Sequence, residues 1–243
     1  MTRRRPLART AAPALALALA GCGADVVHQE DFESYGRGVA PNGPSPGPPR
    51  GDENRTASEY GIGPFGTGQG LTLARVGPDP DILTYAAVPV PGKIGDASGY
   101  GYVFAAEAFV LGPDPMLAEV RKTPVPNPAI GAVLAEVRLE NGDVRALDGE
   151  NPKILDVAYA TGDVLEVSID LDVDAGTYDV AVINTDHRPT DPKDRSDALA
   201  GLALGAPLGP ADDRPYLQLT FADEGGGRSP AVFRIDDVRI TER

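Results

Sequence analysis

Carboxylates are the most numerous side chains capable of chemistry in this chain of 243 residues, which holds 36 Asp and Glu against 22 Lys and Arg. The single Cys excludes a disulfide framework, a Cys-based zinc site and a thiol redox pair. Carboxylates can serve as paired general acids and bases, or as hard oxygen ligands for Ca²⁺. The formal net charge of −14 argues against a nucleic-acid partner, which requires a basic face.

One run of carboxylates has a spacing that fits the first role. Between residues 165 and 174, apolar residues alternate with Glu166, Ser168 and three aspartates, so one strand face should be buried and the other acidic. Asp170 and Asp172 would lie about 6.6 Å apart on the acidic face. That separation permits a paired-carboxylate mechanism, but a solvated strand face explains the same pattern.

Two tyrosines are the best candidates for stacking against a sugar ring, since the chain has no Trp. Tyr100 and Tyr102 flank a glycine and would project from the same face of a strand. Together with Asp170 and Asp172, they are the predicted glycan-binding residues. Packing of both rings in the core or at an edge is the alternative.

A structural calcium site is predicted where the two ends of the chain meet. Strict alternation cannot bury Ile235, Val238 and Ile240 together, so a β-bulge is expected at the two acids between them. Carboxylates at a bulge could meet acids of the first strand and bind Ca²⁺, the one cofactor that the sequence suggests. Pairing of these acids with arginines or water is the alternative. The predicted ligands are Asp31, Glu33, Asp236 and Asp237.

The elements that must position these residues are strands. With 29 Gly and 24 Pro the chain is rich in turns, and short apolar runs are separated by Gly, Pro, Asn or Asp. The sequence predicts loops over 41–50 and 60–70, a hairpin turn at Asn141-Gly142, and one helix over 196–204. The predicted fold class is an all-β antiparallel sandwich, forming one domain over residues 28–243. The expected strands cover 71–76, 82–90, 100–111, 132–139, 144–147, 154–160, 164–173, 178–183, 216–221 and 232–240.

The first 21 residues have the order of an export signal, a basic start followed by an apolar run too short to span a bilayer. Leu19-Ala20-Gly21-Cys22 resembles the lipobox of bacterial lipoproteins, which implies cleavage before Cys22 and acylation of its thiol. Ordinary cleavage after Ala20 is the alternative. Residues 22–27 would then tether the domain to membrane lipid in the bacterial cell envelope. Gly23 in place of an aspartate favours the outer membrane.

Three segments resemble concanavalin A-like (LamG-type) jelly rolls of exported bacterial proteins. They begin at Glu30-Asp31-Phe32, Gly162-Asp163-Val164 and Phe233-Arg234-Ile235. The resemblance implies two packed antiparallel sheets with the first and last strands side by side. Many relatives bind or act on glycans, but fold analogy alone assigns no function.

Three functions remain open from the sequence. The first is a lipid-anchored module that binds a polysaccharide without turnover. The second is a glycan-active hydrolase or lyase that uses acids of the face between Glu166 and Asp174. The third is a structural or protein-interaction domain of the envelope.

Overall fold

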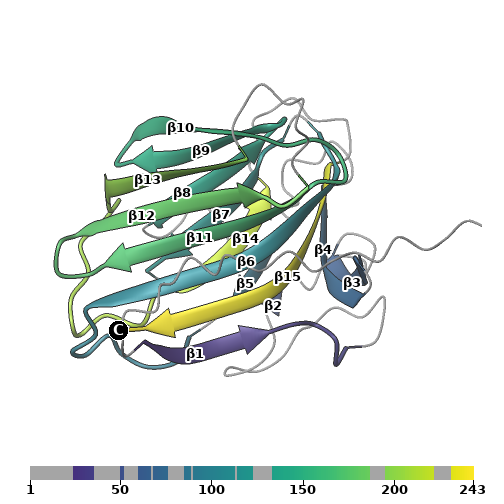
Figure 1. Cartoon of the computed structure of the whole chain (residues 1–243). Coiled ribbons are helices and arrows are strands. Elements are labelled where there is room, and N and C mark those ends of the chain that lie inside the picture. Colours follow the sequence, from purple (N-terminus) through teal and green to yellow (C-terminus); the bar gives the residue numbers. More distant parts are fainter. Residues whose placement is uncertain are drawn as a thin grey trace, which may run out of the picture.

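The computed structural model describes residues 24–35, 50–51, 60–66, 68–75, 85–88, 90–112, 114–122, 133–186, 195–221 and 231–243. These residues form an all-β structure in which two antiparallel sheets, sheet A and sheet B, are stacked (Figure 1). The predicted antiparallel β-sandwich is therefore confirmed. None of the described segments is a helix that could cross a membrane.

Sheet A, as far as the chain is described, contains eight strands. Seven follow the order β13-β12-β11-β6-β15-β4-β3, and β1 pairs with the C-terminal half of β15. The first and last strands thus lie side by side, as the family resemblance implied (Figure 1). The strands are β1 (Asp25–Glu30), β3 (Tyr60–Phe65), β4 (Gly68–Arg75), β6 (Gly99–Val110), β11 (Val164–Asp172), β12 (Thr177–Asn184), β13 (Ser196–Ala203) and β15 (Ala231–Glu242).

Sheet B contains seven strands within the described residues, in the order β10-β9-β8-β7-β14-β5-β2. Its central strands β7 and β14 come from distant parts of the chain and pair directly with each other. The strands are β2 (Arg50–Gly51), β5 (Tyr85–Val88), β7 (Met116–Arg121), β8 (Val133–Glu140), β9 (Asp143–Asp148), β10 (Asn151–Ala158) and β14 (Tyr216–Phe221).

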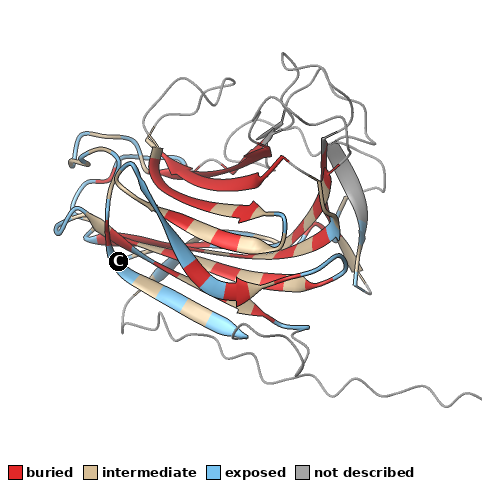
Figure 2. Ribbon diagram, turned by 90° about the horizontal axis from the view of Figure 1, so that it is seen from above, coloured by how far each residue is buried: buried red, intermediate tan, exposed pale blue. Residues whose placement is uncertain are grey.

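The core lies between the facing surfaces of the two sheets. On the strands of sheet A, buried apolar residues alternate with partly exposed residues, as the period of two requires (Figure 2). On β7 and β14, in contrast, every residue is buried. Water is therefore excluded from both faces of sheet B at its centre. Residues that build the core from sheet B include Met116, Ala118, Val120, Val137, Leu139, Leu217, Leu219 and Phe221.

Two local predictions are confirmed. Asn141 and Gly142 both have positive φ, 46° and 92°, and connect β8 to β9 in a tight hairpin. In β15 the pairing with β6 shifts between Asp236 and Arg239, and Asp237 has a φ of 52°. This bulge allows Ile235, Val238 and Ile240 to be buried together.

Two other local predictions are wrong. The segment predicted as a helix over 196–204 forms β13, because β12 offers it an open edge with backbone partners, and such pairing overrides a modest helix propensity. The segment predicted as a loop over 60–70 forms the hairpin of β3 and β4, which turns at Gly66 with a φ of 54°. Small residues suit this hairpin because β15 approaches it closely: a Cβ on Gly70 would lie 2.6 Å from the carbonyl oxygen of Ile235.

Candidate functional site

Tyr100 and Tyr102 do share one strand face, but it is the face that packs into the core. Both side chains are fully buried, and Tyr102 donates its hydroxyl to the carbonyl oxygen of Pro215 at 2.9 Å. Their partners in the pairing of β6 with β11 are the buried residues Leu171 and Ile169. The prediction that these two rings form a glycan-binding surface is therefore wrong.

Asp170 and Asp172 lie on the opposite face of sheet A, which looks away from the core. Asp170 is half-buried and accepts a hydrogen bond from the guanidinium of Arg243. Asp172 is exposed and accepts the backbone N–H of Ala175 at 2.8 Å, which closes the turn between β11 and β12. The structure thus separates these two acids from the two tyrosines, and each acid has a structural partner.

The four predicted calcium ligands are close enough for their charges to interact. Burial raises the pKa of the Asp236 carboxyl to about 7, and the charges of Asp237, Glu33 and Asp31 add to this effect. Glu33 accepts the backbone N–H of Gln69 at 2.7 Å. In the described part of the chain, however, no three His, Cys, Asp or Glu side chains are grouped so that they could hold a metal ion. The calcium site stays a prediction, which titration of the protein with Ca²⁺ would test.

A second set of polar side chains lies on the surface of sheet B that faces away from the core. We call this surface the polar face. Its residues occupy alternate positions on β7, β8 and β14, with one further residue on β9, and the intervening positions supply the core. The polar face consists of Glu119, Arg121, Glu136, Arg138, Arg145, Tyr216, Gln218 and Thr220.

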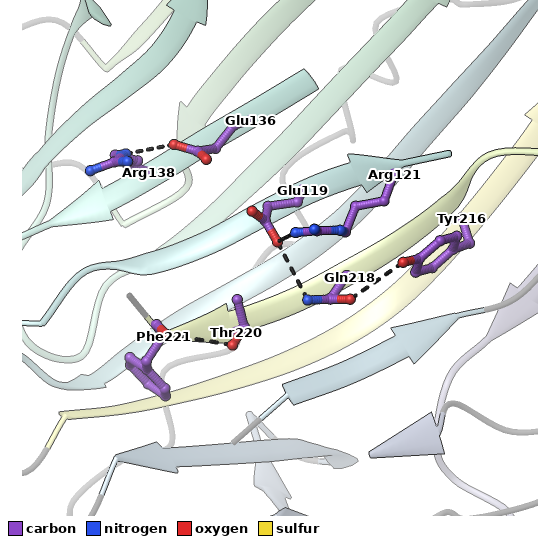
Figure 3. Close-up of polar contacts among 8 residues, drawn as sticks. All are labelled: Glu119, Arg121, Glu136, Arg138, Tyr216, Gln218, Thr220 and Phe221. Atoms are coloured by element: carbon purple, nitrogen blue, oxygen red, sulfur yellow. Dashed lines mark hydrogen bonds and ion pairs between the residues drawn. The ribbon is translucent and has the colours of Figure 1, made fainter. Parts of the chain in front are cut away.

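Hydrogen bonds join Glu119, Arg121, Gln218 and Tyr216 into one network at the centre of the polar face, and a separate pair lies beside it (Figure 3). Nη1 of Arg121 lies 2.8 Å from Oε2 of Glu119, and Nε2 of Gln218 donates to the same oxygen at 3.4 Å. The hydroxyl of Tyr216 donates to Oε1 of Gln218 at 3.5 Å. On the neighbouring strand, Nε of Arg138 donates to Oε1 of Glu136 at 2.5 Å.

Exposure increases stepwise across the polar face from the centre of sheet B toward its β10 edge. One row of directly paired residues crosses five strands in register, from Thr220 through Leu117, Arg138 and Arg145 to Ile154. Thr220 is fully buried, the side chains of Arg138 and Arg145 are 28% and 37% exposed, and Ile154 is 63% exposed. Within the described residues, this face is therefore most accessible to solvent over β9 and β10.

The polar face contains two buried carboxylates, Glu119 and Glu136. Burial raises the pKa of the Glu119 carboxyl, and the negative charge of Glu136 acts in the same direction against the lowering effect of Arg121. Glu136 lies directly opposite Glu119 in the pairing of β8 with β7. Chemically, the face offers guanidinium and amide donors beside carboxylate acceptors, and an aromatic ring at Tyr216.

The polar face does not follow from the sequence, because no strand is predicted over the residues of β7. The segment over 116–121 lies among prolines and is apolar on both sides of its polar residues, so it shows no alternation of buried and exposed residues. A signal does exist in retrospect. The pattern Glu-x-Arg occurs at 119–121 and again at 136–138, and places a carboxylate and a guanidinium on the same strand face each time.

Comparisons with known proteins identify the fold. No protein-family model matches the chain, and no curated protein is detectably similar to it. Among solved structures, a marine PL-14 alginate lyase from Aplysia kurodai aligns with a TM-score of 0.56 at 9% identity, over 90% of this chain and 100% of the lyase. Peanut lectin aligns with a TM-score of 0.51 at 12% identity, over 89% of this chain and 97% of the lectin.

A third structure, the catalytic domain of a GH131 β-glucanase from Podospora anserina, aligns with a TM-score of 0.50 at 14% identity, over 78% of this chain and 81% of that domain. These likenesses establish a concanavalin A-like jelly roll and, at such low identity, the fold alone.

The leader over 1–21, Cys22 and residues 41–49 of the predicted loop lie outside the described residues. Strand β1 begins at Asp25, three positions after Cys22, and β2 begins at Arg50.

Proposed function

We propose that this protein binds a polysaccharide on the polar face of sheet B. The observation that carries the proposal is the hydrogen-bonded network of Glu119, Arg121 and Gln218, which is buried although it lies on the side of the sheet away from the core. Buried polar groups are costly unless they are paired, so a network of this kind on an outer sheet face needs a reason. Recognition of a polar ligand supplies one.

The mixture of donors and acceptors favours a sugar over a simple ion. A sugar hydroxyl both donates and accepts hydrogen bonds, so its site needs groups of both kinds. On the polar face, Arg138 and Gln218 are donors and Glu136 is an acceptor. On β11, in contrast, the outer face of sheet A carries the acids Glu166, Asp170 and Asp172, whose carboxylates only accept hydrogen bonds when ionised.

The structural neighbours support a carbohydrate ligand for this fold. Two of the three alignments above are with a protein named for its action on a glycan, alginate in one case and β-glucan in the other, and the third is with a lectin. These names describe those proteins. For the present chain they support the proposal that its jelly roll recognises a polysaccharide.

Affinity electrophoresis of the full chain in non-ionic detergent tests the proposal. Native gels containing separate polysaccharides, neutral and uronic-acid-rich, should retard the wild-type protein in at least one gel. Arg138→Ala and Arg145→Ala should weaken that retardation about tenfold to hundredfold, since a hydrogen bond to a charged group contributes about 1.5–3 kcal/mol. Arg239→Ala, which removes an exposed arginine from sheet A, is the matched control.

The outcomes separate the remaining functions. Retardation that Arg239→Ala abolishes and Arg138→Ala leaves intact would place the glycan site on sheet A instead. Free migration in every gel would overturn glycan binding and favour the third function, a domain that interacts with envelope proteins.

We further propose that the domain is tethered to the bacterial cell envelope through lipid on Cys22. The lipobox-like sequence Leu19-Ala20-Gly21-Cys22 supports this, and two or three acyl chains would give a stable anchor. The short span from Cys22 to the start of β1 at Asp25 would keep the β1 edge of sheet A near the membrane.

A further inference from the structure

The two inner arginines of the polar face are each paired with a glutamate of their own strand. Nη1 of Arg121 lies 2.8 Å from Oε2 of Glu119 on β7, and Nε of Arg138 lies 2.5 Å from Oε1 of Glu136 on β8 (Figure 3). In both cases the glutamate stands two positions before the arginine and therefore shares its strand face. The positive charge of each guanidinium is thus already compensated within the protein.

The outermost arginine of this face has acidic neighbours as well. Nη1 of Arg145 on β9 lies 3.4 Å from Oε2 of Glu140, which is directly paired with Asp143 at the end of the β8–β9 hairpin. Asp143 stands two positions before Arg145 and shares its strand face. Within the described residues, the polar face therefore carries no surplus of positive charge.

We infer that the polysaccharide bound at the polar face is a neutral one, whose hydroxyl groups bridge the arginine–glutamate pairs, and that the acids of this face exclude polymers of uronic acids. The inference rests on the proposed function, because it needs a glycan on this face. It adds the charge of that glycan, which the proposed function leaves open.

A hydroxyl group and a carboxylate meet an arginine–glutamate pair differently. A sugar hydroxyl can accept a hydrogen bond from the guanidinium and donate its own proton to the adjacent carboxylate, so both members of the pair gain a partner. The carboxylate of a uronic acid can only accept, and it would lie beside a glutamate of like charge. To displace Glu136, whose side chain is 6% exposed, it would leave a buried carboxylate without its cation.

An apolar side chain lies next to these pairs in the accessible part of the face. Ile154 of β10 is directly paired with Arg145, which is directly paired with Arg138. Neighbouring strands are about 4.8 Å apart, so this row extends about 10 Å from β8 to β10. Ile154 is well exposed, and a ligand that covers it removes apolar surface from water. The C–H groups of a neutral sugar ring can make that contact while its hydroxyl groups reach the two arginines.

The charge of the whole protein acts in the same direction. The formal net charge of −14 repels a polyanion as it approaches. Attraction to a local basic patch could overcome this repulsion, but the cations of the polar face are compensated by their acidic neighbours. A neutral polymer is not repelled and loses nothing by this compensation.

Affinity electrophoresis of the full chain in non-ionic detergent tests the charge of the ligand. Dextran, hydroxyethyl cellulose and galactomannan are the neutral polymers, each run beside its carboxymethyl derivative, and alginate and polygalacturonate are the uronic polymers. At least one neutral polymer should retard the wild-type protein, and the polyanions should retard it at least tenfold less. Ile154→Ala should weaken the retardation about threefold to tenfold, since it removes apolar contact area. Val26→Ala, which shortens an exposed apolar side chain of β1, is the matched control.

Removing acids from the face should admit polyanions. The double variant Glu140→Gln/Asp143→Asn leaves Arg145 without these two negative charges, so carboxymethyl polymers should retard it at least fivefold more strongly than the wild-type protein. Glu166→Gln/Asp174→Asn removes the same number of charges from the region of β11 and its following turn. This matched control should migrate past the polyanions like the wild-type protein.

The outcomes separate this inference from the proposed function. Retardation by a polyanion that equals or exceeds retardation by every neutral polymer, and that Arg138→Ala abolishes, would overturn the neutral ligand and leave glycan binding on the polar face intact. A Glu140→Gln/Asp143→Asn variant that gains no more affinity for polyanions than its control would overturn exclusion by the acids. Free migration in every gel would overturn both the inference and the proposed function.

Discussion

Gln218 and Glu119 are 99 positions apart in the sequence, yet they are directly paired in sheet B, with Nε2 of Gln218 3.4 Å from Oε2 of Glu119. Arg121 reaches the same oxygen from the same strand as Glu119. The pairing of β14 with β7 therefore creates the centre of the polar face. Substitutions of Glu119, Arg121 or Gln218 consequently test both the pairing of these strands and the candidate site.

Breaking the central ion pair should be costly. Glu119→Ala removes the counter-charge that Arg121 contacts at 2.8 Å in a fully buried position, and we expect a loss of about 3–5 kcal/mol in the free energy of unfolding. The double variant Glu119→Leu/Arg121→Met should recover most of this loss, since an apolar pair carries no desolvation penalty. Guanidinium denaturation provides the measurement. A single variant as stable as an exposed control such as Glu150→Ala would contradict the pairing.

The pH dependence of stability should report on Asp236. Its pKa rises from about 3.9 in the unfolded chain to about 7 in the folded protein, chiefly through burial. Between these values the folded state holds a proton that the unfolded state lacks, so the free energy of unfolding decreases as the pH rises through this window and levels off above about pH 7. Asp236→Asn should consequently raise the melting temperature at pH 8 and change it little at pH 4.

Thermal unfolding at both pH values checks this expectation, with Asp174→Asn in an exposed turn as the matched control. An Asp236→Asn effect of equal size at pH 4 and pH 8 would show that the pKa of Asp236 is not raised.

Close contact between β4 and β15 should make Gly70 intolerant of a side chain. A Cβ there would lie 2.6 Å from the carbonyl oxygen of Ile235 and 2.9 Å from Cβ of Phe65. Gly70→Ala should lower the free energy of unfolding by about 1–3 kcal/mol, the usual cost of overpacking. Gly209→Ala is the control, because its Cβ would find its nearest atom 3.8 Å away. Similar denaturation midpoints for the two variants would refute the close approach.

Lipid attachment at Cys22 should be separable from folding. In a bacterial host that processes lipoproteins, radiolabelled palmitate should be incorporated into the wild-type protein and not into Cys22→Ser. The Cys22→Ser variant should move from the membrane fraction to the periplasmic fraction, while its melting temperature stays the same as that of the wild-type protein. Labelling of both proteins would exclude Cys22 as the acylated residue.

Local features of the sequence were sufficient for most strands and for two backbone irregularities. Alternating residues of β11 identified its buried face, because side chains on a strand point to opposite sides in turn. The Asn141-Gly142 turn and the Asp236–Asp237 bulge followed from which residues tolerate positive φ and which must be buried. Each of these depends on residues only a few positions apart.

Tertiary structure alone decided where the candidate site lies. Alternation placed Tyr100 and Tyr102 on one face but could not tell that this face packs on Ile169 and Leu171, since that depends on the pairing of β6 with β11. The strand β7 is buried on both sides and shows no alternation, so its register with β8 and β14 could not be inferred. That register places Glu119 opposite Glu136 and Gln218. Long-range pairing of strands, which no local pattern encodes, sets both relationships.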